Sequence, residues 1–292
     1  MERPLTLDLH RLDRLIISFR GGLAGFYSGQ RLTNKYGSSL EFADYRPYLP
    51  GDDIRRIDWL LYGRSNRLYT RLNRGEVDAT VNFLLDGSGS MNWGEPSKGW
   101  RTLQLTLALS YISLQSYDRV AIGLGCHDVG TYLPPLYGKG SFPRLSRFLE
   151  QQEFNREGDL NRLLASFQKT VKPRQMTVLI SDFLSPGGYR AGLERLLAAR
   201  QELLLIHVAS PDELEPPFAG PVALQDVETA RKKEVTVDPH IREHYRQAVK
   251  EHREEIADFC RRRDINYLFY TTEDDPVEFL LAAAPRLFKN MY

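Results

Sequence analysis

Residues 81–91 read Val-Asn-Phe-Leu-Leu-Asp-Gly-Ser-Gly-Ser-Met, an apolar run that ends in one carboxylate and two hydroxyl side chains. Val81–Leu85 is typical of a strand buried on both faces, and open α/β sheets bind ligands just beyond the carboxyl ends of such strands. The intervening glycines permit a tight turn, so the hydroxyls of Ser88 and Ser90 can face the carboxylate of Asp86. These hard oxygen ligands predict a site for Mg²⁺ or another divalent cation.

A second buried strand, residues 176–181, is followed by Asp182. The carboxyl ends of neighbouring parallel strands lie at one edge of a sheet, so we expect Asp86 and Asp182 to face one crevice. With Ser88 and Ser90, they resemble the metal-ion-dependent adhesion site of von Willebrand factor A-type domains. The resemblance implies a metal with one open coordination position, which an acidic side chain of a partner protein fills.

One loop departs from that family pattern. The family has a threonine on a middle loop, usually within Gly-Gly-Thr, where this chain reads Glu-Gly-Asp-Leu over residues 157–160. If Asp159 replaces the threonine as a ligand, three carboxylates surround the ion and weaken its attraction for a partner's carboxylate. Asp159 is also placed to cap a helix that begins at Leu160.

From residue 78 onwards, the pattern alternates between strands and helices. We predict strands up to residue 86 and over residues 119–126, 131–137, 176–181, 202–209 and 265–270. We predict helices over residues 100–115, 191–200, 239–263 and 276–288, and two between residues 142 and 169. This alternation predicts an α/β fold with a doubly wound, mostly parallel sheet of the Rossmann type. The resemblance makes that sheet von Willebrand factor A-like.

The helix expected over residues 239–263 has an apolar face. Residues at helical spacing form it: Ile241, Tyr245, Ala248, Val249, Ile256 and Phe259. Such a stripe predicts packing against the core along the whole helix.

The N-terminal quarter follows a different pattern. Leucines and other apolar residues between Leu5 and Phe19 recur at helical spacing and stop at Gly21–Gly22, which predicts an opening helix. Residues 37–74 mix short β-like runs, a Pro-Gly turn and one helical stretch, which predicts a small β-rich module. We therefore divide the chain into residues 1–75 and a sheet domain over residues 76–292.

Residues 41–59 carry a second resemblance. They read Glu-Phe-Ala-Asp-Tyr-Arg-Pro-Tyr-Leu-Pro-Gly-Asp-Asp-Ile-Arg-Arg-Ile-Asp-Trp, which resembles the signature of the domain-of-unknown-function-58 family. Its members join such a segment to a von Willebrand factor A-like domain, so the resemblance covers nearly the whole chain. The resemblance implies that the protein acts with a MoxR-type AAA+ ATPase in the assembly or activation of a client protein. No catalytic activity is established for that family. Many members also have an N-terminal membrane anchor, which we do not expect here.

Two roles stay open for this signature segment. Its alternating charges predict a network of ion pairs and hydrogen bonds that docks the module on the sheet domain. Alternatively, a docking face for the ATPase is formed by residue types favoured at binding hot spots, namely Arg46, Arg55, Arg56 and Trp59.

Met91 and Trp93 follow the serine loop and offer apolar surface. They are candidates for contact with the partner, and equally for covering the start of the next helix.

Composition narrows the class of protein. The net charge of the 292-residue chain is +1, which argues against a uniformly basic nucleic-acid surface, although residues 1–75 are basic. The two cysteines, Cys126 and Cys260, fit reduced thiols and a cytoplasmic protein. No apolar run approaches the roughly 20 residues that span a bilayer, so we expect no membrane insertion. We expect a monomer in isolation.

Two other classes of function stay open. Arginines close to Tyr62 and Tyr69 suit single-stranded nucleic acid, namely Arg64, Arg67, Arg71 and Arg74. Alternatively, Asp86, Asp159 and Asp182 with Mg²⁺ activate water for phosphoester hydrolysis. The sequence favours a non-enzymatic, metal-dependent protein-binding module over both.

Overall fold

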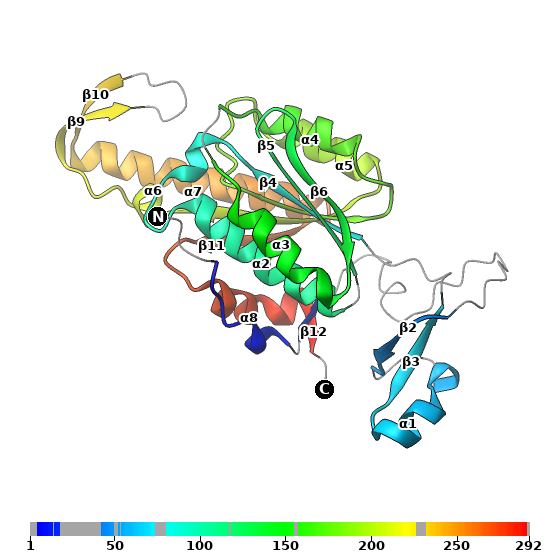
Figure 1. The fold of residues 1–292 in the computed structure, drawn as a ribbon. Coiled ribbons are helices and arrows are strands. Elements are labelled where there is room, and N and C mark those ends of the chain that lie inside the picture. The colour runs from blue at the N-terminus through cyan, green and yellow to red at the C-terminus, as the bar shows by residue number, and fades with distance from the viewer. Residues whose placement is uncertain are drawn as a thin grey trace.

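A six-stranded sheet forms the centre of the fold in the computed structural model, which describes residues 5–13, 15–17, 42–49, 52, 54–73, 80–116, 118–154, 157–225 and 232–290. The strand order is β11-β8-β7-β4-β5-β6 (Figure 1). These strands are β4 (Thr80–Asp86), β5 (Arg119–Gly125), β6 (Val129–Tyr137), β7 (Met176–Ser181), β8 (Glu202–Ala209) and β11 (Asn266–Thr271). All neighbouring strands are parallel except β5 and β6. The predicted α/β fold with a mostly parallel sheet is confirmed.

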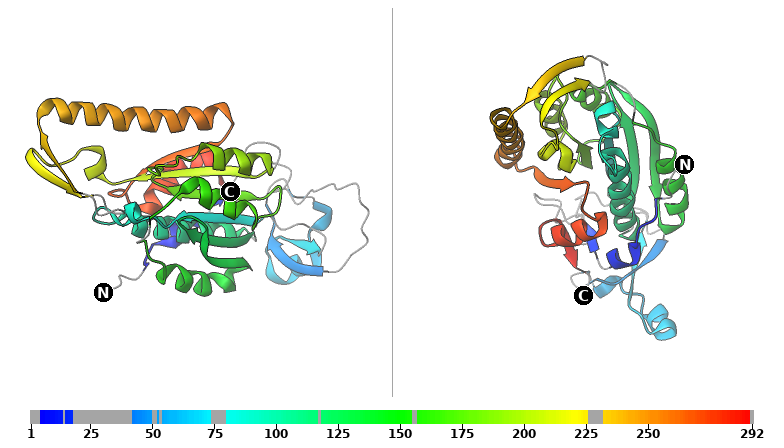
Figure 2. Two further views of the ribbon diagram at one scale, coloured as in Figure 1. Left: turned by 90° about the horizontal axis from the view of Figure 1, so that it is seen from above. Right: turned by 90° about the vertical axis from the view of Figure 1, so that its left-hand side faces the viewer.

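Helices cover both faces of this sheet (Figure 2). One face packs against α2 (Lys98–Gln115), α3 (Phe142–Glu150) and α8 (Pro276–Leu287). The other packs against α4 (Leu160–Gln168), α5 (Arg190–Ala198) and the second half of α7 (Pro239–Arg262). Every residue of β4 is buried, with Phe83 in the first core and Leu84 in the second. Burial on both faces explains why this strand reads as a continuous apolar run.

Smaller elements follow β8. They are the short helix α6 (Pro211–Leu214) and an antiparallel hairpin of β9 (Gly220–Gln225) and β10 (Lys232–Val237). Cys126 is half-buried and Cys260 is buried, and neither forms a disulfide with another described residue. In the described part of the chain, no helix combines the length and apolar character needed to cross a membrane.

The opening segment does not form the predicted helix. It forms a 3₁₀ turn at Leu9–Leu12 and a strand, β1 (Leu15–Ile17), which pairs antiparallel with β12 (Phe288–Asn290). Its apolar side chains enter the core beside α2 and α8, namely Leu5, Leu12 and Leu15. The apolar spacing of this segment favours a helix locally. Pairing with a distant strand overrides that preference, so the same apolar side chains pack in the core without forming a helix. The described residues between 5 and 17 therefore pack with the sheet domain, and Gly21–Gly22 lie outside the described residues.

The described part of the small module contains two strands, one α-helix and a 3₁₀ turn at Ile54–Arg56. β2 (Phe42–Pro47) pairs antiparallel with β3 (Tyr69–Asn73), and α1 (Trp59–Ser65) lies between them in the chain. Figure 1 shows these elements beside the sheet domain rather than within it. Several residues of the signature and basic segments lie outside the description, namely Glu41, Pro50–Gly51, Asp53, Arg74 and the side chain of Arg71.

Two buried aspartates hold the module together. Asp52 forms an ion pair with Arg46 and accepts the N–H of Leu49 at 2.9 Å. Asp58 caps α1 and also accepts the hydroxyl of Tyr45 at 2.7 Å. These contacts all join residues of the module itself. They stabilise it internally, and docking on the sheet domain stays a prediction.

The carboxylate of Glu202, at the start of β8, is buried. Neither carboxylate oxygen of Glu202 has a hydrogen-bond partner among the described residues. Burial, reinforced by the nearby Asp264 carboxylate, raises the pKa of Glu202 to about 8. The folded protein therefore holds this proton more tightly than the unfolded chain. The resulting stabilisation is complete below the ordinary pKa of 4.5 and is lost as the pH rises towards 8.

We expect Glu202→Gln to raise the free energy of unfolding by about 1 kcal/mol at pH 9, allowing for solvent screening, and to change it little at pH 4. Urea denaturation at both pH values measures this. The control is Glu251→Gln, which removes an exposed carboxylate from α7. An equal effect of Glu202→Gln at both pH values would contradict the assignment.

Candidate functional site

The two predicted carboxylates lie where the direction of strand addition reverses. β4 is flanked by β5 on one side and β7 on the other, so the chain adds strands first one way and then the other. Open α/β sheets bind ligands at such a switch point. Asp86 ends β4, Asp182 follows β7, and both side chains are buried.

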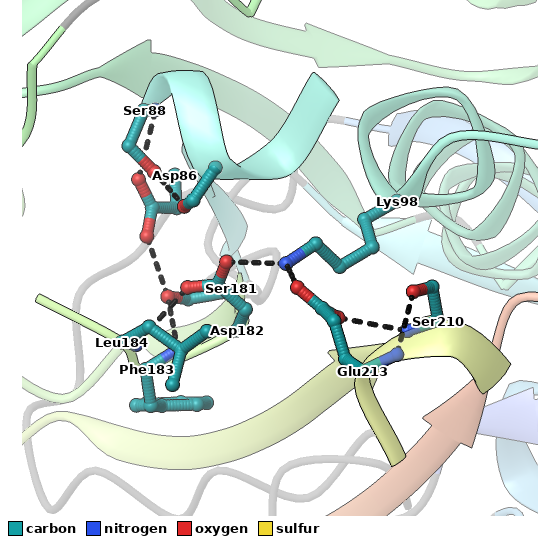
Figure 3. Close-up of polar contacts among 10 residues, drawn as sticks. Asp86, Ser88, Lys98, Ser181, Asp182, Phe183, Leu184, Ser210 and Glu213 are labelled. Carbon is teal, nitrogen blue, oxygen red and sulfur yellow. Dashed lines mark hydrogen bonds and ion pairs between the residues drawn. The ribbon is translucent and has the colours of Figure 1, made fainter. Parts of the chain in front are cut away.

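Hydrogen bonds connect the oxygen atoms of this site (Figure 3). The Ser181 hydroxyl donates to Asp86 Oδ2 at 2.5 Å, and the Ser88 N–H donates to Asp86 Oδ1 at 3.0 Å. The hydroxyls of Ser88 and Ser90 lie 3.0 Å apart. A hydrogen bond from Ser90 also helps to lower the pKa of Asp182. The structure thus brings the four predicted ligands Asp86, Ser88, Ser90 and Asp182 together.

A buried lysine reaches the same crevice. Lys98 Nζ donates to Asp182 Oδ2 at 2.6 Å and also to Glu213 Oε1 (Figure 3). Lys98 is the first residue of α2, whose N-cap Ser97 accepts the N–H of Trp100. Glu213 lies on α6 in a capping box with Ser210, whose N–H it accepts at 2.9 Å. The ammonium therefore joins the end of β7 to α2 and α6.

Burial and neighbouring charges shift the pKa values of Asp86, Asp182 and Lys98 in different directions. Burial, followed by repulsion from Asp182, raises the pKa of Asp86 to about 6. Burial alone would raise the pKa of Asp182, but the Lys98 ammonium outweighs it and the pKa is lowered. Burial alone would lower the pKa of Lys98, but Asp182 and Glu213 outweigh it and the pKa is raised. Lys98 is therefore charged, and Asp182 and Glu213 share its one positive charge.

These donors fit a small divalent cation. Two carboxylates and two hydroxyls are the hard oxygen ligands that Mg²⁺ accepts, with water in its other positions. Within the described ranges, no group of three or more His, Cys, Asp or Glu side chains is placed to hold a metal ion. A cation here would therefore depend on Ser88 and Ser90 as much as on Asp86 and Asp182.

Asp159 caps α4. Its carboxylate accepts the N–H of Arg162 at 3.0 Å and packs against Gly187, whose added Cβ would lie 3.1 Å from it. The preceding Gly158 packs on the serine loop, because a Cβ there would lie 2.8 Å from the Cβ of Ser88. The structure thus shows the capping alternative, while the role of Asp159 as a metal ligand stays a prediction.

The two partner candidates on the serine loop differ in exposure. Met91 is fully buried, because the 3₁₀ turn Gly89–Asn92 directs it into the core beside α2. Its burial excludes contact with a partner, one of the two roles left open for it. Trp93 is 42% exposed and stays a candidate.

The module candidates also differ. Arg46 is half-buried in its ion pair with Asp52, so its observed role is structural. Arg55 is exposed and Arg56 is half-buried. Trp59 is 61% exposed and remains available to a partner.

The sequence analysis did not predict Lys98 and Glu213 as site residues, although each lies in a recognisable sequence pattern. A lysine in the first turn of a helix faces the positive end of the helix dipole, so it favours a nearby carboxylate. Ser210 and Glu213 have the spacing of a capping box, directly after an apolar strand. Both signals place charged residues at the carboxyl edge of the sheet.

The chain belongs to a family described as proteins of unknown function, DUF58, whose model matches residues 44–255. An uncharacterized protein of Mycobacterium tuberculosis is 28% identical over 269 residues, which cover 90% of this chain and 84% of that protein. An uncharacterized protein of Mycobacterium avium is 36% identical over 118 residues, which cover 40% of this chain and 69% of that protein. The solved structure of a conserved hypothetical protein, BatB of Bacteroides thetaiotaomicron, aligns with 13% identity and a TM-score of 0.43, covering 70% of this chain and 95% of that one.

We expect Lys98→Met to lower the free energy of unfolding by about 3–5 kcal/mol in buffer containing EDTA, because two carboxylates lose their cation. Urea denaturation measures the loss. Lys250→Met, which removes an exposed ammonium from α7, is the control. Adding Asp182→Asn to Lys98→Met should lose less than the sum of the single variants. A loss below about 1 kcal/mol for Lys98→Met would contradict this role of the ion pair.

Proposed function

We propose that this protein is a non-enzymatic, metal-dependent protein-binding module of the von Willebrand factor A type. Asp86, Ser88, Ser90 and Asp182 would hold Mg²⁺, which would offer an open coordination position to an acidic side chain of a partner. One observation carries the proposal: two buried carboxylates and two hydroxyls converge at the switch point of a mostly parallel sheet.

The surrounding contacts support a site that is already organised. Ser181 and the Ser88 N–H fix both oxygens of Asp86. Lys98 fixes one oxygen of Asp182, and the Leu184 N–H donates to the other at 3.0 Å. Side chains held in this way need little rearrangement to bind a cation.

Binding is favoured over phosphoester hydrolysis by the position of Asp159. A hydrolytic site would use this third carboxylate with Asp86 and Asp182 to activate water. Its engagement as the N-cap of α4 makes it a poor candidate for that role.

We propose further that the small module contacts a MoxR-type AAA+ ATPase. Large apolar side chains of this module are exposed: Trp59 at 61%, Leu60 at 75% and Ile54 at 63%. The module's Asp52 and Asp58 are buried in internal contacts, so they contribute little charge to this surface. Exposed aromatic and aliphatic surface of this kind suits a protein partner.

We expect Asp86→Asn to weaken Mg²⁺ binding at least tenfold, because the metal loses a charged ligand while the side chain keeps its shape. Isothermal titration of the purified protein with MgCl₂ measures the affinity. Asp212→Asn removes an exposed carboxylate next to Glu213 and should bind as the wild type does. Absence of Mg²⁺ binding by the wild type would refute the metal site.

We expect the double variant Trp59→Ala, Leu60→Ser to lose capture of the MoxR-type ATPase encoded nearest to its gene, without loss of Mg²⁺ affinity. Both side chains are largely exposed, so the folded structure should persist. Leu224→Ser removes an exposed leucine from the hairpin strand β9 and is the control. Capture by the double variant equal to that by the wild type would exclude this surface.

A further inference from the structure

A cavity of 240 Å³ lies beside Asp182, between α7 and the carboxyl ends of β8 and β11. We call it the α7 cavity and define it by six of its lining residues, Leu184, His207, Tyr245, Val249, His252 and Phe269. Asp182 also lines it, as does Glu213. The cavity therefore adjoins the candidate metal site at Asp182.

The cavity exists because only half of the apolar face of α7 reaches the core. Ile256 and Phe259 are buried against the sheet, as the sequence predicted. Ile241 and Tyr245, about three to five turns earlier, are 41% and 40% exposed, so the prediction of core packing is wrong for this half. Figure 2 shows α7 as the long orange helix along the outside of the sheet domain. Apolar surface on its first half is thus left without a core beneath it.

Most of the residues that line the cavity are aliphatic or aromatic, and the charged ones are Asp182, Glu213 and Arg253. The His207 ring lies 5.1 Å from the Phe269 ring between centroids, and its Nδ1 is 2.8 Å from the Tyr267 hydroxyl. Burial lowers the pKa of His207 to about 3, so its imidazole is neutral. Arg253 stacks over Phe269, with Cζ 4.8 Å from the ring centroid.

One ring nitrogen among the lining residues lacks a hydrogen bond to any described residue. His252 Nε2 is buried and has no hydrogen-bond partner among the described residues. A buried polar atom without a partner is unfavourable, so a ligand that forms a hydrogen bond with it gains affinity. The chemistry of the lining therefore favours an aromatic group that carries its own polar atom.

The volume of the α7 cavity limits the size of the group that can bind in it. A cavity of about 150 Å³ holds benzene, and small-molecule sites typically span about 300–1,000 Å³. At 240 Å³, the α7 cavity lies between these values. It suits one large aromatic side chain better than a nucleotide or a cofactor.

We propose that the α7 cavity receives one tryptophan or tyrosine side chain of the partner protein whose carboxylate engages the metal site. This inference rests on the proposed function, because it gives the same partner a second contact. Asp182 belongs to both places, so the partner's acidic and aromatic residues lie within a few residues of each other. Leu184, which is 53% exposed at the rim, adds apolar contact for the chain between them.

Selection from a random peptide library displayed on phage tests this chemistry. On the wild-type protein in MgCl₂, we expect enriched peptides to contain Asp or Glu close to Trp or Tyr. EDTA or Asp86→Asn should remove the acidic preference and leave the aromatic one. Enrichment without Trp or Tyr would overturn the proposal.

Filling the cavity provides the matched comparison. Val249→Trp places an indole within the lining, and Ala248→Phe at a more exposed lining position serves if that variant does not fold. Either should abolish the aromatic preference and keep the Mg²⁺ affinity of the wild type. Gln247→Trp adds the same side chain to an exposed neighbour outside the lining and should change nothing. Unchanged aromatic enrichment on the filled variants would overturn the proposal.

Indole titration followed by NMR separates the cavity from the metal site. The wild type should bind indole with or without Mg²⁺, Val249→Trp should not, and His252→Phe should lose the preference for indole over toluene. Aromatic enrichment and indole binding without Mg²⁺ binding would refute the proposed metal site and retain the aromatic pocket. Two other results would overturn the proposal.

Indole binding without any peptide enrichment would identify a small-molecule site. Self-association of the wild type that Val249→Trp abolishes would identify a second copy of the chain as the occupant.

Discussion

The buried ion pair between Lys98 and Asp182 is the interaction on which the carboxyl edge of the sheet depends. Removing an ammonium from water costs several kcal/mol, and only a close carboxylate with good hydrogen bonds offsets that cost. Because Glu213 contacts the same ammonium, the pair fixes the start of α2, the end of β7 and helix α6 relative to one another. Asp182 also accepts a hydrogen bond from Ser90 of the serine loop, and Asp182 and Glu213 line the α7 cavity, so the pair borders both features.

The same pair sets how strongly the site attracts a cation. Lys98 already neutralises part of the charge of Asp182, whereas Asp86 is stabilised by hydrogen bonds from Ser181 and Ser88. A divalent ion bound there would be held by less negative charge than the carboxylates alone suggest. Weak, exchangeable metal binding is suited to a contact that forms and dissociates.

The sequence predicted the elements that depend on local pattern and missed those that depend on distant contacts. Buried parallel strands, such as Val81–Leu85, were recognised because they are apolar throughout. The opening helix was wrong because β1 pairs with β12, at the other end of the chain. Asp86, Ser88 and Ser90 were found by spacing, and Asp182 by its place after a strand. Lys98 was missed because its carboxylate partners lie 84 and 115 residues away in the chain.

The pairing of β1 with β12 changes how the small module is connected. Because residues 5–17 belong to the sheet domain, residues 42–73 form an insertion with the same domain before and after it in the chain. An inserted module has two covalent connections to its host, one leading from β1 and one leading to β4. A pull or a rotation applied to the module would therefore act on two points of the sheet domain, one of which leads into the strand that ends at Asp86.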